Sequence, residues 1–153
     1  MNVPIALSPE CVAIIAADDK REVLAALAGV FAGAWQLDDE LVLEHLEERE
    51  RLGSTGFGRG VAIPHARYPD LSRPVAAVLR LDQPVDYTAA DGLPVELVFG
   101  LLSPENSGAT HLHALATVSR LMREEKLRDS LADAPDEAAL YSLLIGATER
   151  DAA

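Results

Sequence analysis

The sequence predicts a single domain of mixed α and β structure, and three features lead to that prediction. Its 153 residues suffice for one domain with a sizeable core, and 49% of them are hydrophobic. The segment Leu93–Leu102 (LPVELVFGLL) is an almost unbroken apolar run, as expected of a strand covered on both faces. Between Val23 and Phe31, apolar residues instead recur at helical spacing, which is typical of an amphipathic helix.

The composition excludes several classes of function. The chain has 13 basic and 25 acidic residues, a net charge of −12 and an isoelectric point near 4.6. Such a balance argues against nucleic-acid binding and suits partners with basic patches. The single cysteine, Cys11, excludes an internal disulfide and offers no metal framework. The sequence MNVPIALSPE does not resemble a signal peptide, and no apolar run is long enough to cross a membrane, so we expect a cytoplasmic protein without direct membrane insertion.

The first part of the chain contains an irregular entry over residues 1–11 and then a helix. Ser8-Pro9-Glu10 resembles a helix start that soon stops, and residues 12–16 suit either a short strand or the end of that helix. Asp19 and Glu22 form a plausible capping box for the next helix, which we expect to end at Gly33.

A second helix is predicted from Asp38 or Asp39 to about Leu52. Most of its charged residues are expected on a solvated surface, and His45 is expected in the core or in a supporting position. Arg49 is different, because it lies on the semi-buried side just before a glycine-rich loop. Its guanidinium is suited to holding a phosphate through two parallel hydrogen bonds, and the alternative is an ordinary ion pair with a neighbouring glutamate.

The segment Leu52–Arg67 reads LGSTGFGRGVAIPHAR and carries the strongest functional signal. Its glycines let the backbone turn sharply and leave N–H groups uncovered, which suits an anionic oxygen. Residues 61–63 predict a short buried strand that ends at Pro64, so His65 leaves a rigid element at a defined angle. A neutral imidazole is both a nucleophile and a good leaving group, so His65 among anion ligands is a candidate carrier of a phosphoryl group.

Two plainer interpretations of this segment stay open: a tight connection, and a histidine with a structural role only. Two nucleotide-binding motifs are excluded. The P-loop pattern is absent and no lysine lies nearby. Gly56-Phe57-Gly58 also precedes the apolar run, whereas a dinucleotide fingerprint follows a strand and opens a helix.

The chain after His65 alternates turns and strands. We expect a polar turn over residues 68–74, a strand over 75–81 that breaks at Asp82-Gln83-Pro84, a short strand over 85–87, and the apolar strand over 93–102. Glu96 within that last strand is expected to be paired structurally.

Three helical pieces complete the chain. The first starts near Ser107 or Gly108 and places His111 in its first turn on the buried side, where the helix dipole favours an anion and a neutral imidazole. His113 points elsewhere, so the two histidines make a poor metal pair. Further helical pieces are expected over residues 124–131 and 136–145, the last ended by Gly146 and followed by a frayed tail.

Several of these motifs together resemble a known family. The motifs are Glu48-Arg49-Glu50, Gly53-Ser54-Thr55-Gly56, Gly60 to His65 (GVAIPH), Val95 to Phe99, Thr110 to Leu115 (THLHAL) and Ala134 to Tyr141. They resemble the IIA proteins of the bacterial phosphoenolpyruvate phosphotransferase system, in the fructose, mannitol and nitrogen-regulatory branch. The resemblance implies an α/β fold with a central mixed sheet of about five strands flanked by helices on both sides. It implies one domain over residues 1–153, with a core at about 5–145.

The resemblance also implies roles for individual residues. His65 would accept a phosphoryl group from the phosphohistidine of the carrier HPr or its nitrogen-branch homologue, and no other cofactor or metal is expected. Arg49 would hold the phosphoryl group and His111 would assist. The predicted binding residues that line the site are Ser54, Thr55, Gly60 and Arg67.

The nitrogen-regulatory members are the most similar, because Pro64-His65-Ala66-Arg67 and the short chain suit them. The expected function is therefore a regulatory IIA whose phosphorylated and unphosphorylated forms select different protein targets. The alternative is a sugar-specific IIA that passes phosphate to a IIB protein. A structural module that is never phosphorylated is the third interpretation.

Overall fold

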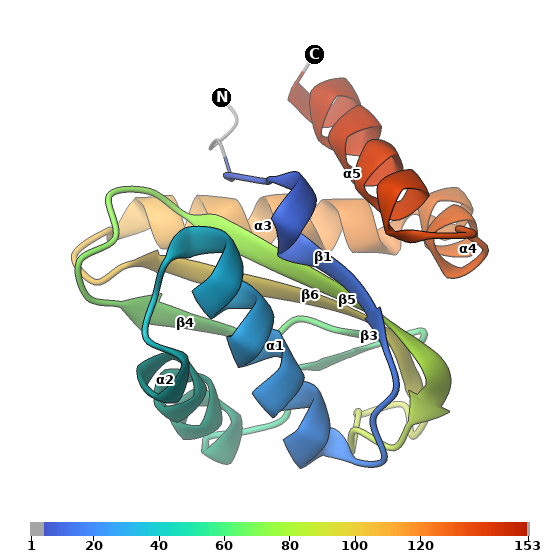
Figure 1. The fold of residues 1–153 in the computed structure, drawn as a ribbon, viewed down its shortest axis with the longest axis horizontal. Helices are drawn as coiled ribbons and strands as arrows, with labels where there is room; N and C mark the ends of the chain where they lie inside the picture. Colours follow the sequence, from blue (N-terminus) through green and yellow to red (C-terminus); the bar gives the residue numbers. More distant parts are fainter. Residues whose placement is uncertain (1–4, 153) are drawn as a thin grey trace.

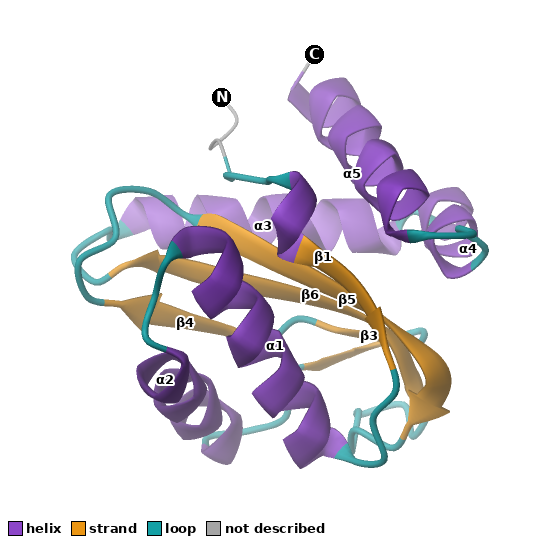
Figure 2. Ribbon diagram, viewed as in Figure 1, coloured by secondary structure: helices purple, strands orange, loops and turns teal. Residues whose placement is uncertain are grey.

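A mixed β-sheet lies between two layers of helices in the computed structural model, which describes residues 5–152 (Figures 1 and 2). One face of the sheet is covered by α1 (Lys20–Trp35) and α2 (Asp39–Arg51). The other face is covered by α3 (Ala109–Arg123), α4 (Glu125–Ala132) and α5 (Glu137–Ala152). The prediction of an α/β fold with helices on both sides of the sheet is confirmed.

The sheet has six strands: β1 (Val12–Ile15), β2 (Gly56–Gly58), β3 (Val61–Ala62), β4 (His65–Tyr68), β5 (Val75–Val85) and β6 (Val95–Pro104). Their order is β1-β5-β6-β3-β2, and β4 also pairs with β6. The pairs β1–β5, β3–β6 and β4–β6 are parallel, whereas β5–β6 and β2–β3 are antiparallel. The sequence predicts about five strands. The two predicted over residues 75–81 and 85–87 correspond to the single strand β5, and β2 and β4 are additional.

Strands β3 and β4 run beside β6 as one interrupted strand. Val61 and Ala62 pair with Leu97 and Val98, and the pairing resumes where His65 meets Leu101. Pro64 lies in the break and has no N–H to donate, while its carbonyl accepts a 3.0 Å hydrogen bond from the Leu101 amide. His65 therefore begins a new strand, and the predicted turn starts only after Tyr68.

Two predicted boundaries near the start of the chain are settled by backbone conformation. The structure has a short 3₁₀ turn over Pro9–Cys11 and a strand in β1, which decides between the two alternatives for this segment; residues 1–4 of the predicted entry lie outside the described residues. The prediction that α1 ends at Gly33 is wrong. The helix continues for two residues to Trp35, and the left-handed backbone of the next residue, Gln36 (φ 53°), stops the helical repeat.

The predicted break at Asp82-Gln83-Pro84 is also wrong, because β5 runs through it. The regular pairing of β5 with β6 is interrupted between Arg80 and Val85. Residues 82–84 are exposed there, so proline lies in an irregular stretch where a missing N–H costs little.

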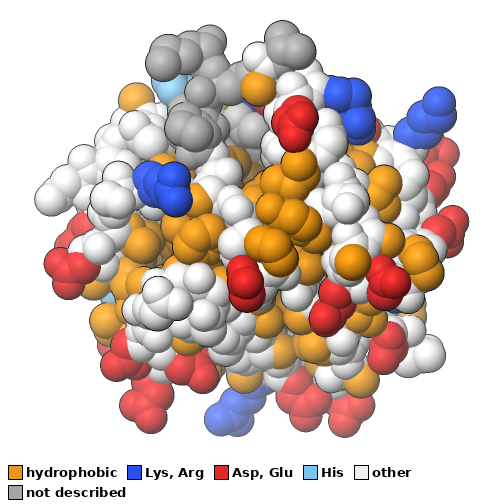
Figure 3. All heavy atoms as spheres, turned by 45° about the horizontal axis from the view of Figure 1, so that its top comes forward, with side chains coloured by type: hydrophobic (Ala, Val, Ile, Leu, Met, Phe, Trp, Pro, Cys, Tyr) orange, Lys and Arg blue, Asp and Glu red, His pale blue; other side chains and the backbone are white. Residues whose placement is uncertain are grey.

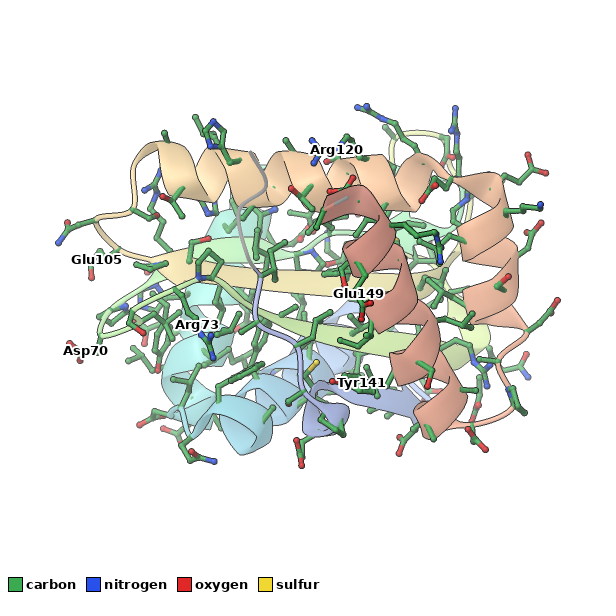
Figure 4. All side chains as sticks on the ribbon, turned by 90° about the horizontal axis from the view of Figure 1, so that it is seen from above. Asp70, Arg73, Glu105, Arg120, Tyr141 and Glu149 are labelled. Carbon is green, nitrogen blue, oxygen red and sulfur yellow. The ribbon has the colours of Figure 1, made fainter. Side chains whose placement is uncertain are left out.

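Helix α5 does not end at Gly146 but extends to Ala152. Ala147 is buried, and the guanidinium of Arg120 in α3 contacts both carboxylate oxygens of Asp151 at 3.1–3.2 Å. These contacts attach the last turns of α5 to α3 (Arg120 is labelled in Figure 4). The predicted frayed tail is therefore helical up to Ala152.

Each face of the sheet has its own core. Alternate residues of β5 divide between them, so that Ala77 and Leu79 pack under α1 and α2 while Ala76 and Val78 pack under the other helices. Gly100 permits the close approach of α1, because a Cβ atom there would lie 2.8 Å from a Leu27 methyl carbon and 2.9 Å from the Phe31 ring.

One face of the molecule presents a mixture of apolar and acidic side chains. Figure 3 shows apolar side chains between acidic ones on the face nearest the chain ends. Within residues 5–152, no helix is both long and apolar enough to cross a membrane.

Candidate functional site

His65 is held in one defined orientation by the strand break before it. Its Nδ1 lies 2.7 Å from the carbonyl oxygen of Ile63, which the interruption at Pro64 leaves outside the sheet ladder. Because a carbonyl oxygen can only accept, Nδ1 carries the ring hydrogen and Nε2 keeps its lone pair. The nucleophilic nitrogen of His65 is therefore Nε2.

Arg49 contacts that nitrogen. Its Nε donates to Nε2 of His65 at 3.3 Å, and its Nη1 donates to the carbonyl oxygen of Gly53 at 3.0 Å. The second bond fixes the guanidinium against the loop that follows α2. A forked cation is thus positioned beside the lone pair, where a phosphoryl group bound to Nε2 would place its oxygens.

The surroundings of His65 favour its neutral form. Burial lowers the pKa of this half-buried imidazole below its usual value, and the Arg49 charge acts in the same direction. The hydrogen bond to Ile63 and the Glu50 carboxylate oppose this shift but do not cancel it. At neutral pH the ring is therefore mostly uncharged and able to act as a nucleophile.

His111 faces His65 from the start of α3. The two ring centroids are 5.9 Å apart, and Nδ1 of His111 lies 2.7 Å from Oγ of Ser103, a fully buried residue of β6. Burial, then the charges of Arg67 and His65, lower the pKa of His111 to about 4. The sequence predicts a neutral His111 from the helix dipole, and the structure adds burial and the nearby Arg67 charge as causes.

Arg67 is the second arginine near His65, and Arg49 and Arg67 together are called the cationic rim here. It lies two residues after His65 in β4, so both side chains point to one face of the sheet, and it is opposite Ser103 in β6. Its Nη1 reaches Oγ of Ser107 at 3.4 Å. The structure thus brings His65, Arg49, His111 and Arg67 together at one end of the β4–β6 pair.

The other predicted binding residues form hydrogen bonds within the protein. Oγ of Ser54 accepts from the Gly56 amide at 3.1 Å and donates to the Tyr87 carbonyl at 3.3 Å. The buried Thr55 hydroxyl bonds to Glu50 and lies 3.2 Å from the Tyr87 hydroxyl. The carbonyl of Gly60, in the β2–β3 turn, accepts from Glu96 and Leu97. Their direct contact with a phosphoryl group stays a prediction.

Sequence reasoning missed the importance of Glu50. We expected it on a solvated surface, but its side chain is only 7% exposed and contacts Lys20, Thr55 and Tyr87. Burial raises the pKa of Glu50, but hydrogen bonds from Lys20 and Thr55 outweigh it and hold the pKa below the usual value. Ser103 was missed as well; a serine closing an apolar strand was the only signal for it.

The remaining histidines make none of the contacts described above. His45 packs edge-on against Tyr68 with 5.5 Å between ring centroids, in keeping with its predicted supporting position, and His113 is exposed. Across residues 5–152, no three histidine, cysteine or acidic side chains are grouped so that they would hold a metal ion.

Comparison with known proteins identifies the family of this fold and site. The profile described as "Phosphoenolpyruvate-dependent sugar phosphotransferase system, EIIA 2" matches residues 6–146. The chain belongs to this EIIA type-2 family.

The relatives include nitrogen regulatory proteins and a sugar-specific protein. The chain is 39% identical over 145 residues to a nitrogen regulatory protein of Bradyrhizobium diazoefficiens, covering 94% of this chain and 95% of that protein. The crystal structure of the nitrogen regulatory protein IIA-Ntr from Neisseria meningitidis superposes with a TM-score of 0.78 at 32% identity, covering 89% of this chain and 97% of that one. A fructose-specific EIIA component from Haloferax volcanii is 32% identical over 85% of each chain.

Proposed function

We propose that this chain is a phosphohistidine carrier of the nitrogen-regulatory branch, in which Nε2 of His65 accepts a phosphoryl group from an HPr-type protein. The observation that carries the proposal is the pair of contacts on the His65 ring. Nδ1 is tied to the Ile63 carbonyl at 2.7 Å, and Nε2 faces the Arg49 guanidinium at 3.3 Å. One nitrogen is locked as the hydrogen-bond donor, and the other is left as the nucleophile.

The transfer step follows from this geometry. The Nε2 lone pair attacks phosphorus and forms an N–P bond, while the N–P bond to the donor's imidazole breaks and its electron pair returns to that ring. Nδ1 of His65 keeps its proton, and the Ile63 carbonyl stabilises the positive charge that develops on the ring. The Arg49 guanidinium exchanges its contact with the nitrogen for the phosphoryl oxygens.

The cationic rim supports the same step. Phosphoryl transfer is catalysed mainly by positioning and by charge stabilisation. Arg49 and Arg67 supply fixed positive charge, and neutral His111 offers a ring nitrogen near His65. In a protein of net charge −12, this concentration of cationic side chains around one histidine favours an anionic group there.

A labelling experiment tests the proposal. The protein is incubated with phosphoenolpyruvate, enzyme I and an HPr-type carrier, and the modified residue is mapped by mass spectrometry. We expect one label on His65, labile to acid and stable to alkali, as in a phosphoramidate. Undiminished labelling of His65→Ala would show that another residue is the acceptor.

The regulatory role is tested with charge variants at His65. A phosphoryl group adds about 1.5 to 2 negative charges, and salt screens them beyond about 8–10 Å, so the switch acts locally. A target that docks over the loop must desolvate or pair this charge. We expect His65→Asp to lose regulatory targets from a lysate that His65→Ala retains.

The alternative is a sugar-specific IIA that passes the phosphoryl group to a IIB protein, and the fructose-specific relative favours it. Identical target sets for the two His65 variants, together with rapid transfer to a separate IIB protein, would decide for this alternative.

A further inference from the structure

Lys20, the first residue of α1, joins three segments that are distant in the sequence. Its ammonium lies 2.8 Å from Oε2 of Glu50 at the end of α2. It also donates to Oγ1 of Thr88 at 3.3 Å and lies 4.6 Å from the centre of the Tyr87 ring. The side chain of Lys20 is 25% exposed.

Glu50 is the acceptor at the centre of a cluster formed with Lys20, Thr55 and Tyr87. The Thr55 amide donates to Oε2 at 2.7 Å, the Tyr87 hydroxyl donates to Oε1 at 3.1 Å, and the Thr55 hydroxyl also donates to Oε1. Tyr87 is fully buried. With Lys20, four donors surround a carboxylate that has little contact with water, which is the condition for a stable buried charge.

This cluster is connected to Arg49 through the loop that follows α2. Arg49 immediately precedes Glu50 on α2, and its guanidinium is fixed by the carbonyl of Gly53. Gly53 belongs to the short loop between Glu50 and Thr55, whose two ends the Glu50 carboxylate holds together. Losing the carboxylate's partners would release the loop, and with it the acceptor that directs Arg49 towards His65.

We propose that Lys20 is a positioning residue for phosphoryl transfer: by neutralising Glu50 it holds the α2–β2 loop and keeps Arg49 against Nε2 of His65. This inference rests on the proposed function. Lys20 has a second effect of the same sign, because an unneutralised Glu50 would repel the phosphoryl oxygens arriving nearby.

The first test is the rate of transfer from a phosphorylated HPr-type carrier. Lys20→Met is expected to lower kcat about ten- to a hundredfold, the usual loss for a residue that supports a reacting group through another. The KM for the carrier should change little, because the proposed role of Lys20 is to position Arg49 and not to contact the carrier. Lys20→Arg keeps the charge and should restore most of the rate.

Arg21 provides the matched control. It lies beside Lys20 in the same turn of α1 and lines the same surface cleft, but it is exposed, and within residues 5–152 no ion pair joins it to Glu50. Arg21→Met removes the same charge and should leave kcat unchanged. In a Glu50→Gln background, Lys20→Met should add little further loss, because its action passes through Glu50.

The second test follows the titration of His65 by NMR and does not require phosphorylation. The charged groups that act on His65 are Arg49 and Glu50. Lys20 is the ion-pair partner of Glu50, and Arg67, which shares β4 with His65, acts on the neighbouring His111. Removing Lys20 leaves the Glu50 charge uncompensated, so the pKa of His65 should rise in Lys20→Met. It should return towards the wild-type value in Lys20→Met/Glu50→Gln, which a loss of packing alone would not produce.

The outcomes separate the two claims. An unphosphorylated wild-type protein would refute the proposed function, while the titration would still decide the role of Lys20. Wild-type kcat and an unshifted His65 in Lys20→Met would overturn the inference. If Lys20→Met fails to fold, Lys20→Gln and the neutral pair Lys20→Met/Glu50→Gln give the same two readouts.

Discussion

The Nε atom of Arg49 donates a hydrogen bond to Nε2 of His65 across 3.3 Å, joining the last turn of α2 to the first residue of β4. The contact places a cation on the one ring nitrogen of His65 that keeps a lone pair. We therefore expect the two residues to act as a unit in phosphoryl transfer. Without Arg49, His65 would face a phosphoryl group with no adjacent cation from α2.

Replacing Arg49 should therefore slow phosphoryl transfer strongly. Losing a preorganised donor to a developing anion costs about 10²–10³ in rate, and Arg49→Ala should fall in that range. Arg49→Lys should also be impaired, because an ammonium cannot bond Gly53 and the phosphoryl group as a fork. Arg51→Lys, on the exposed side of the same helix, is the control. Stopped-flow transfer at the wild-type rate in Arg49→Lys would contradict this role.

His111 should matter where His113 does not. His111 is buried, faces His65 and is bonded to Ser103, whereas His113 is exposed. We expect His111→Ala to lose transfer rate by about 10²-fold or more if its ring contacts the phosphoryl group. His113→Ala should transfer normally. Equal rates for both variants, with normal circular dichroism, would remove His111 from the mechanism.

The depressed pKa of His111 predicts a pH-dependent stability. Its pKa is about 4 in the folded protein and near its usual 6.5 in the unfolded chain. Between these values the unfolded chain binds the additional proton, so the free energy of unfolding rises with pH through this window. Lowering the pH from 7.5 to 5 should cost about 2 kcal/mol at this residue. Urea titrations should find a flatter profile for His111→Gln than for His113→Gln.

Two glycines should respond oppositely to alanine. A Cβ at Gly100 would collide with Leu27 and Phe31, so Gly100→Ala should lower the free energy of unfolding by about 1–3 kcal/mol. A Cβ at Gly33 would meet nothing within 4 Å, and this residue is helical. Gly33→Ala should raise the stability by about 0.5–1 kcal/mol. Changes of the same sign in thermal and urea unfolding would refute this account of α1 packing.

The sequence by itself determined the fold class, the family resemblance and the central residues of the candidate site. These depend on local patterns: the apolar run that became β6, the N-cap residues Asp19 and Asp38, and the rigid Pro64-His65 step. Each of them acts within a few residues, so its effect is visible in the order of residues alone.

Only the tertiary structure decided which residues support the site. In the sequence Glu50 resembles the other surface acids of its helix, and only the folded chain brings Lys20 and Tyr87 to it. The supporting position of Ser103 likewise depends on its contact with His111 of α3. The strands β2 and β4 exist only because β3 and β6 offer them partners, and the last turns of α5 are held by Arg120. Burial and pairing between distant segments are properties of the packed molecule, so helix and strand periodicity could not reveal them.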